Sequence, residues 1–170
     1  MDNDIILAVA EALDHQHIAT LRFNFRGVGM SEGTFADGIG EREDTKAAIS
    51  FLSKEEKIDP NRIGLCGYSF GTVVGFPVAA EDNRIKAIAG ISPFISPPDL
   101  FSGCAKPKFL IWGNRDTYID LEKLERIKDD LPAPKHCEAV PRVDHFWWGY
   151  EMEVGSKVAV FFATALKAKA

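Results

Sequence analysis

Apolar stretches with helix-like and strand-like spacing alternate along the whole chain. Residues 5–13 repeat apolar positions as an amphipathic helix does, whereas residues 18–25 favour a strand. The predicted strands span 18–25, 62–68, 85–91, 109–112 and 137–143, and the predicted helices span 5–13, 41–52, 72–80, 121–131 and 154–169. Alternating strands and helices imply right-handed crossovers and a parallel sheet with helices on both faces. The pattern therefore predicts an α/β fold, a three-layer α/β/α sandwich with a mostly parallel sheet of about five strands.

Length and charge narrow the functional classes. A chain of 170 residues suits a single domain, and the longest irregular connections, 26–40 and 92–108, are too short to hold a lid domain. The net charge of −5 offers no basic stripe for nucleic acid. No apolar run reaches the length of a membrane span, and no basic region precedes an apolar one at the N-terminus. Three cysteines without a C-x-x-C pair suit reduced thiols, so we expect a cytoplasmic protein.

The most informative motif is Gly67-Tyr68-Ser69-Phe70-Gly71, which reads G-x-S-x-G. It follows a predicted strand and precedes a predicted helix, the setting of a nucleophile elbow in which the serine Oγ stands clear of the sheet. We expect Gly67 and Gly71 to keep Cβ atoms out of a tight crossing. The N–H of Phe70, at the helix N-terminus, is the expected oxyanion donor. The alternative is a purely structural turn, and Pro77 weakens the helix prediction.

A nucleophilic serine needs a base at the carboxyl end of the sheet, where functional groups of parallel α/β proteins gather. His15, His17 and His136 fall at the amino ends of predicted strands, whereas His145 directly follows the last strand. Strand-end geometry therefore selects His145.

The acid that orients this base is expected after the fourth predicted strand. Asp116 lies in that loop, and Asp120, the reserve candidate, is placed to cap the following helix. Asp144 adjoins His145, but neighbouring side chains in a loop usually diverge. We therefore assign Asp116, and the chain order Ser69, Asp116, His145 is the order expected for this architecture.

The sequence resembles the α/β-hydrolase superfamily, in its small, lidless branch near dienelactone-hydrolase-like esterases. Four segments in the expected order carry the resemblance, namely 21–33, the elbow 67–71, 110–116 and 143–146. It implies a serine hydrolase acting on carboxylic esters, with Ser69 as nucleophile, Asp116 as acid and His145 as base. It also implies that neither a metal nor an organic cofactor is needed.

The sequence departs from the superfamily at its front. Members usually have three more strands before 18–25, and the third lies between that strand and the elbow strand. The loop after it normally supplies a second oxyanion donor, and its usual His-Gly or Gly-Gly sequence is absent here. We expect strand 18–25 to pair directly with strand 62–68, or a second chain to cover the exposed edge in a homodimer. Backbone N–H groups near Met1 or Arg26-Gly27 are candidate second donors.

The expected substrate is a small ester with a short acyl chain. The aromatic residues Phe146, Trp147 and Trp148 beside His145 are candidate pocket walls, although aromatic runs also occur in cores. Arg26 is a candidate for binding an acidic substrate, or else ties down its loop. Two alternatives stay open: a non-catalytic hydrolase-like binding protein, and an acyltransferase that uses the same three residues.

Overall fold

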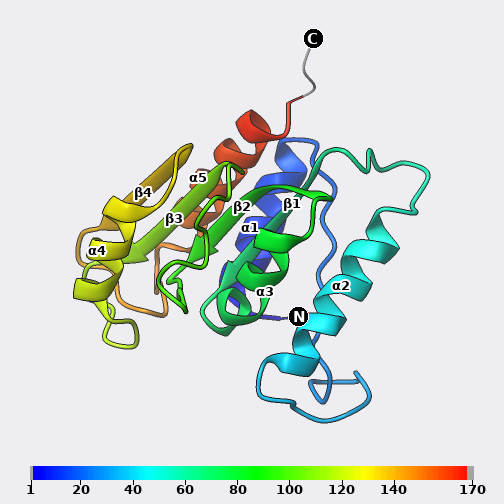
Figure 1. Cartoon of the computed structure of the whole chain (residues 1–170), viewed down its shortest axis with the longest axis horizontal. Coiled ribbons are helices and arrows are strands. Elements are labelled where there is room, and N and C mark those ends of the chain that lie inside the picture. The colour runs from blue at the N-terminus through cyan, green and yellow to red at the C-terminus, as the bar shows by residue number, and fades with distance from the viewer. Residues whose placement is uncertain (1, 168–170) are drawn as a thin grey trace.

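Residues 2–167 are described in the computed structural model and form a parallel sheet between two layers of helices (Figure 1). The strands lie in the order β1 (Ile63–Tyr68), β2 (Ile85–Ile91), β3 (Lys108–Gly113) and β4 (Lys135–Val140). The helices are α1 (Asp4–His15), α2 (Ile39–Leu52), α3 (Phe70–Glu81), α4 (Leu121–Asp130) and α5 (Glu151–Ala165). The predicted α/β sandwich is confirmed.

Both faces of the sheet are buried, which explains the apolar strands. Along β3, Phe109 and Ile111 pack in the cluster that includes α1 and α5. Leu110 and Trp112 pack in the opposite cluster, with residues of α2, α3 and α4. Every residue of β3 is buried. Two buried faces turn the alternating pattern of an ordinary strand into a continuous apolar run.

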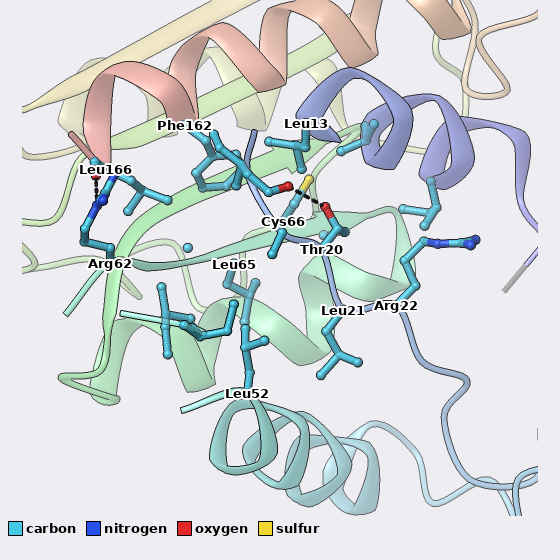
Figure 2. A pocket seen from close by; sticks show the side chains of 18 of the residues that line it. Leu13, Thr20, Leu21, Arg22, Leu52, Arg62, Leu65, Cys66, Phe162 and Leu166 are labelled. Carbon is cyan, nitrogen blue, oxygen red and sulfur yellow. Dashed lines mark hydrogen bonds between the residues drawn. The ribbon is translucent and has the colours of Figure 1, made fainter. Parts of the chain in front are cut away.

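The sheet has four strands, so the prediction of five is wrong. Residues 18–25 form no strand, and β1 pairs only with β2 among the described residues. A groove separates 18–25 from β1 (Figure 2), and their backbones therefore form no ladder. Alternating apolar residues favour a strand only where a second strand can pair with their N–H and C=O groups. The predicted direct pairing of 18–25 with β1 is wrong for the same reason.

The remaining elements lie close to their predicted positions. Helix α3 continues through Pro77, which removes a single backbone donor without ending the helix. The last predicted helix ends at Ala165 in the structure, so its predicted extension through Leu166 and Lys167 is wrong. The rest of that extension, 168–169, lies outside the described residues. None of the helices within residues 2–167 combines the length and apolar character that a bilayer crossing needs.

Helices α1 and α5 pack at close range on one face of the sheet. A Cβ added to Gly155 of α5 would lie 2.7 Å from the carbonyl oxygen of Ala8 and 3.2 Å from the amide nitrogen of Val9. Both are backbone atoms of α1, so no side-chain rotation can relieve the clash. Glycine at position 155 therefore sets the distance between the two helices.

We predict that Gly155→Ala destabilises the fold. A glycine-to-alanine change inside a helix normally gains about 0.5–1 kcal/mol. Here the displaced α1 costs about 1–3 kcal/mol, as overpacked cores do, so the net free energy of unfolding falls. Urea denaturation measures it, with Ser156→Ala at the exposed neighbouring position as the matched control. A gain in stability for Gly155→Ala would contradict the close packing.

Candidate active site

Ser69 lies at the turn between β1 and α3, in a strained backbone conformation. Its φ of 50° and ψ of −117° lie in a region that non-glycine residues rarely adopt. Two hydrogen bonds hold it there: the Ser69 N–H donates to the Ile91 carbonyl at 3.0 Å, and the Thr72 N–H donates to the Ser69 carbonyl at 2.9 Å. The predicted strand–turn–helix setting of the serine is confirmed.

The two glycines of the elbow differ in their surroundings. A Cβ on Gly67 would lie 2.7 Å from the Gly71 carbonyl oxygen and 2.9 Å from the Thr72 amide nitrogen, so only glycine fits at 67. A Cβ on Gly71 would meet no atom within 4 Å. The expectation that both glycines relieve a crossing is therefore right for Gly67 and wrong for Gly71, which faces open space.

Ser69, His145 and Asp116 form a continuous chain of contacts. The Ser69 Oγ lies 2.9 Å from Nε2 of His145, and Nδ1 of the same ring lies 2.8 Å from Oδ2 of Asp116. A carboxylate only accepts, so Nδ1 carries the proton and Nε2 is free to accept from the serine hydroxyl. The structure thus brings together the three residues that the sequence selected.

Asp116 is buried, and each of its carboxylate oxygens has a donor. Oδ1 accepts from the N–H groups of Tyr118 and Ile119 at 2.9 and 3.2 Å, while Oδ2 faces His145. Buried charge is costly unless it is paired and hydrogen-bonded, and these three donors meet that need. The loop after β3 therefore holds the carboxylate in one orientation.

The backbone of the histidine loop is also anchored. The Tyr68 hydroxyl donates to the His145 carbonyl at 2.9 Å. Burial, and then the negative charges of Asp116 and Asp144, raise the pKa of Tyr68 to about 12, so this donor keeps its proton at neutral pH. The Tyr118 ring also packs against the imidazole, with the two ring centroids 4.7 Å apart. The sequence analysis did not predict these contacts of Tyr68 and Tyr118. The available indication was their position in the chain, since Tyr68 is one residue from Ser69 and Tyr118 is two residues from Asp116.

The competing acids have structural roles. Asp120 caps α4, its side chain accepting from the Lys123 N–H. Asp144 accepts from the N–H groups of Phe146 and Trp147 and so shapes the loop that carries His145. These structural roles agree with the preference for Asp116 over Asp120 and Asp144 in the sequence analysis.

The aromatic residues after His145 divide between surface and core. Phe146 is exposed and lies edge-on to the His145 ring, and Trp148 is exposed as well. Trp147 is fully buried, and its Nε1 donates to the Ser92 hydroxyl at 3.1 Å. The prediction that Trp147 lines a substrate pocket is therefore wrong: it packs in the core beneath the loop. Sequence alone could not tell which of three adjacent aromatics turns inward.

Arg26 pairs with Asp44 of α2. Its Nε and Nη2 both reach that carboxylate, the shortest contact being 2.6 Å, and its own N–H donates to Asp44 as well. The structure therefore supports the second interpretation of Arg26, in which its side chain holds its loop in place and does not bind a substrate. The hydrogen bonds from Arg26 lower the pKa of the Asp44 carboxyl.

Phe70, the predicted oxyanion donor, directly follows Ser69 in the chain. Phe70 is the first residue of α3, where backbone N–H groups have no partner within the helix. The two other candidate donors are engaged elsewhere, because Arg26 N–H donates to Asp44 and Gly27 N–H donates to the Glu32 carbonyl. Of the candidate donors near Met1, Met1 itself lies outside the described residues. Within residues 2–167 no group of three or more acidic, histidine or cysteine side chains is placed to hold a metal ion.

The model of the X-Pro dipeptidyl-peptidase (S15) family matches residues 18–152. The chain belongs to this family. An uncharacterised protein of Rickettsia prowazekii is 26% identical over 167 residues, which cover 92% of this chain and 69% of that protein. The quorum-quenching protein AidA of Acinetobacter baumannii is 39% identical over 92 residues, 52% of this chain, and this match spans only 30% of AidA.

A solved structure extends the likeness to the whole chain. The Xanthomonas campestris protein XC6422, described as an α/β serine hydrolase without a lid, superposes with a TM-score of 0.86 at 27% identity. The match covers 100% of this chain and 77% of that one. The expected likeness to small, lidless α/β-hydrolases is confirmed.

We predict that Asp44→Asn destabilises the protein at neutral pH and not in strong acid. A carboxyl whose pKa is lower in the folded state stabilises the fold above its unfolded pKa, and this contribution is lost as the pH falls through the folded value. Wild type and variant should therefore differ most above about pH 4 and converge below it. Denaturation midpoints at pH 7 and pH 2.5 measure this.

The matched control is Glu43→Gln. Glu43 pairs with Lys46 on the exposed face of the same helix, and such pairs contribute little. An equal effect of both substitutions at pH 7 would contradict the anchoring role of Asp44.

Proposed function

We propose that this protein is a serine hydrolase that cleaves carboxylic esters with short acyl chains. The observation that carries the proposal is the uninterrupted contact from Asp116 through His145 to Ser69, at 2.8 and 2.9 Å. Membership of a serine-peptidase family and the likeness to a lidless serine hydrolase support hydrolysis as the class of reaction. The free cysteines are consistent with a cytoplasmic location, which we also propose.

The reaction proceeds in two acyl-transfer steps. His145 Nε2 takes the proton of the Ser69 hydroxyl while Oγ attacks the ester carbonyl. The Phe70 N–H donates to the oxyanion of the tetrahedral intermediate. As the intermediate collapses, the imidazolium returns its proton to the departing alcohol. Water then attacks the acyl-enzyme with His145 again as base, which releases the acid and restores Ser69. Asp116 holds the tautomer and stabilises the imidazolium.

The surface around Ser69 favours small, apolar ester groups. On one side Tyr118 and Phe146 are exposed beside the His145 ring. On the other side the Phe70 ring lies between those of Phe25 and Phe35, with centroids 5.8 Å away in each case. Aromatic walls bind apolar groups without fixing them by charge, since the nearby Arg26 is already paired with Asp44.

We predict that Ser69→Ala lowers the hydrolysis of 4-nitrophenyl butyrate at least about 10⁴-fold, because nucleophile loss leaves only binding and oxyanion stabilisation. The wild type should be labelled at Ser69 by a fluorophosphonate and should prefer butyrate to laurate. An equal rate for Ser69→Ala, or no labelling of wild type, would rule out the serine mechanism. A higher kcat/KM for an Xaa-Pro 4-nitroanilide than for the butyrate ester would instead assign an amide substrate.

Asp116 and Asp120 provide a matched pair of substitutions. Asp116→Asn should lower kcat about 10⁴-fold, because an amide in place of the carboxylate stabilises the wrong histidine tautomer. Asp120→Asn should leave kcat and stability nearly unchanged, since asparagine caps helices as well as aspartate does. A larger loss of kcat in Asp120→Asn than in Asp116→Asn would overturn the assignment of the acid.

A further inference from the structure

Two aromatic side chains lie at the surface of the candidate active site, outside both cores. The exposed fractions of Tyr118 and Phe146 are 61% and 46%, and neither residue belongs to the two buried clusters of the described chain. His145, whose ring both of them contact, is only 6% exposed. Core packing therefore does not account for the two rings, and their place over a buried base points to a ligand.

The rings of Tyr118, Phe146 and His145 meet at a corner. The Tyr118 ring is tilted by 33° to the imidazole, with the two centroids 4.7 Å apart. The Phe146 ring stands at 88° to the imidazole and at 81° to Tyr118, with its centroid 5.6 and 5.3 Å from theirs. A flat ring in such a corner can pack offset against one wall and edge-on to the other, and both are preferred geometries of aromatic pairs. A puckered aliphatic ring gains neither.

The corner includes the ring that protonates the departing alcohol. This step belongs to the proposed hydrolysis, on which the inference therefore rests. When the tetrahedral intermediate collapses, the bond between the carbonyl carbon and the alcohol oxygen breaks, and that oxygen takes the proton from Nε2 of His145. Proton transfer requires the oxygen to lie about 3 Å from Nε2. The group that this oxygen carries therefore begins beside the imidazole, within reach of the two rings that contact it.

We propose that Tyr118 and Phe146 form the subsite for the leaving alcohol of the ester, and that this alcohol is aromatic. The Tyr118 ring is not what holds the acid in place, because the backbone N–H of Tyr118 donates to Asp116 at 2.9 Å. Removing the ring leaves that hydrogen bond intact. The subsite can therefore be tested apart from the chain of contacts that activates Ser69.

The test compares benzyl butyrate with cyclohexylmethyl butyrate. Both esters form the same butyryl-enzyme, so a difference in kcat/KM reports how the alcohol part is bound during acylation. The cyclohexyl group is the more apolar of the two, so hydrophobic burial alone would favour its ester. Aromatic packing is worth roughly two- to tenfold in a rate constant. We therefore expect kcat/KM to be at least about threefold higher for the benzyl ester, after division by the hydroxide rate of each ester.

Substitutions assign this benzyl preference to the two rings. Tyr118→Leu and Phe146→Leu should each lower the ratio at least about twofold, whereas Tyr118→Phe, which keeps the ring, should retain it. A merely structural effect would slow both esters alike and leave the ratio unchanged. Phe51→Leu removes a phenyl ring that is 59% exposed on α2, and it should change neither the ratio nor the rates. A wild-type ratio of one or below, or a ratio that survives both leucine substitutions, would overturn the proposal.

A binding measurement separates the subsite from the proposed activity. A folded wild type that cleaves neither ester would overturn the proposed hydrolysis, and binding then decides the subsite. Ser69→Ala forms no acyl-enzyme, so NMR can follow the intact esters on that variant. The benzyl ester should shift the amide signals of Tyr118 and Phe146 and bind at least about threefold more tightly than the cyclohexylmethyl ester. Equal or weaker binding of the benzyl ester, in a protein that cleaves neither, would overturn the aromatic subsite as well.

Discussion

The close crossing of β1 and α3 is the constraint on which the rest of the site depends. Position 67 admits no side chain, because the backbone of Gly71 and Thr72 lies where its Cβ would be. Only a sharp turn connects a strand to a helix that approaches so closely, and that turn forces Ser69 to a positive φ. The same turn makes Phe70 the first residue of α3. The strained backbone of Ser69 and the start of α3 at Phe70 are thus two results of one packing contact.

The parallel sheet supplies the other two groups. Because β1, β3 and β4 all run in the same direction, the loops that follow them open at one edge, and Ser69, Asp116 and His145 stand on those loops. Gly113, at the end of β3, allows the loop that carries His145 to approach closely, because a Cβ at position 113 would clash with the backbone carbonyl of Val143. Hydrogen bonds from Tyr68, Tyr118 and Ile119 then hold the histidine loop and the carboxylate. The triad geometry is therefore built mainly from backbone contacts.

Some of these features depend on local sequence and strand order, and others on contacts between distant segments; only the first kind could be predicted from the sequence. The G-x-S-x-G motif identified Ser69, and the positions of Asp116 and His145 after their predicted strands identified the other two residues. Whether 18–25 becomes a strand depends on a neighbour, and periodicity in one segment carries no information about what lies beside it. The burial of Trp147 likewise depends on the conformation of its loop, in which Trp147 has a positive φ of 59°. The anchoring of Arg26 depends on Asp44, a partner 18 positions along the chain. The predictions for 18–25, Trp147 and Arg26 each depended on a contact between distant segments.

The groove and the candidate active site meet at two residues. Tyr68 lies on β1 beside the groove and also holds the His145 carbonyl, and Gly71 lines the groove two positions after Ser69. On that side of Ser69 the backbone donors of Arg26 and Gly27 are already engaged. Tyr68 therefore links the edge of the sheet to the loop that carries His145.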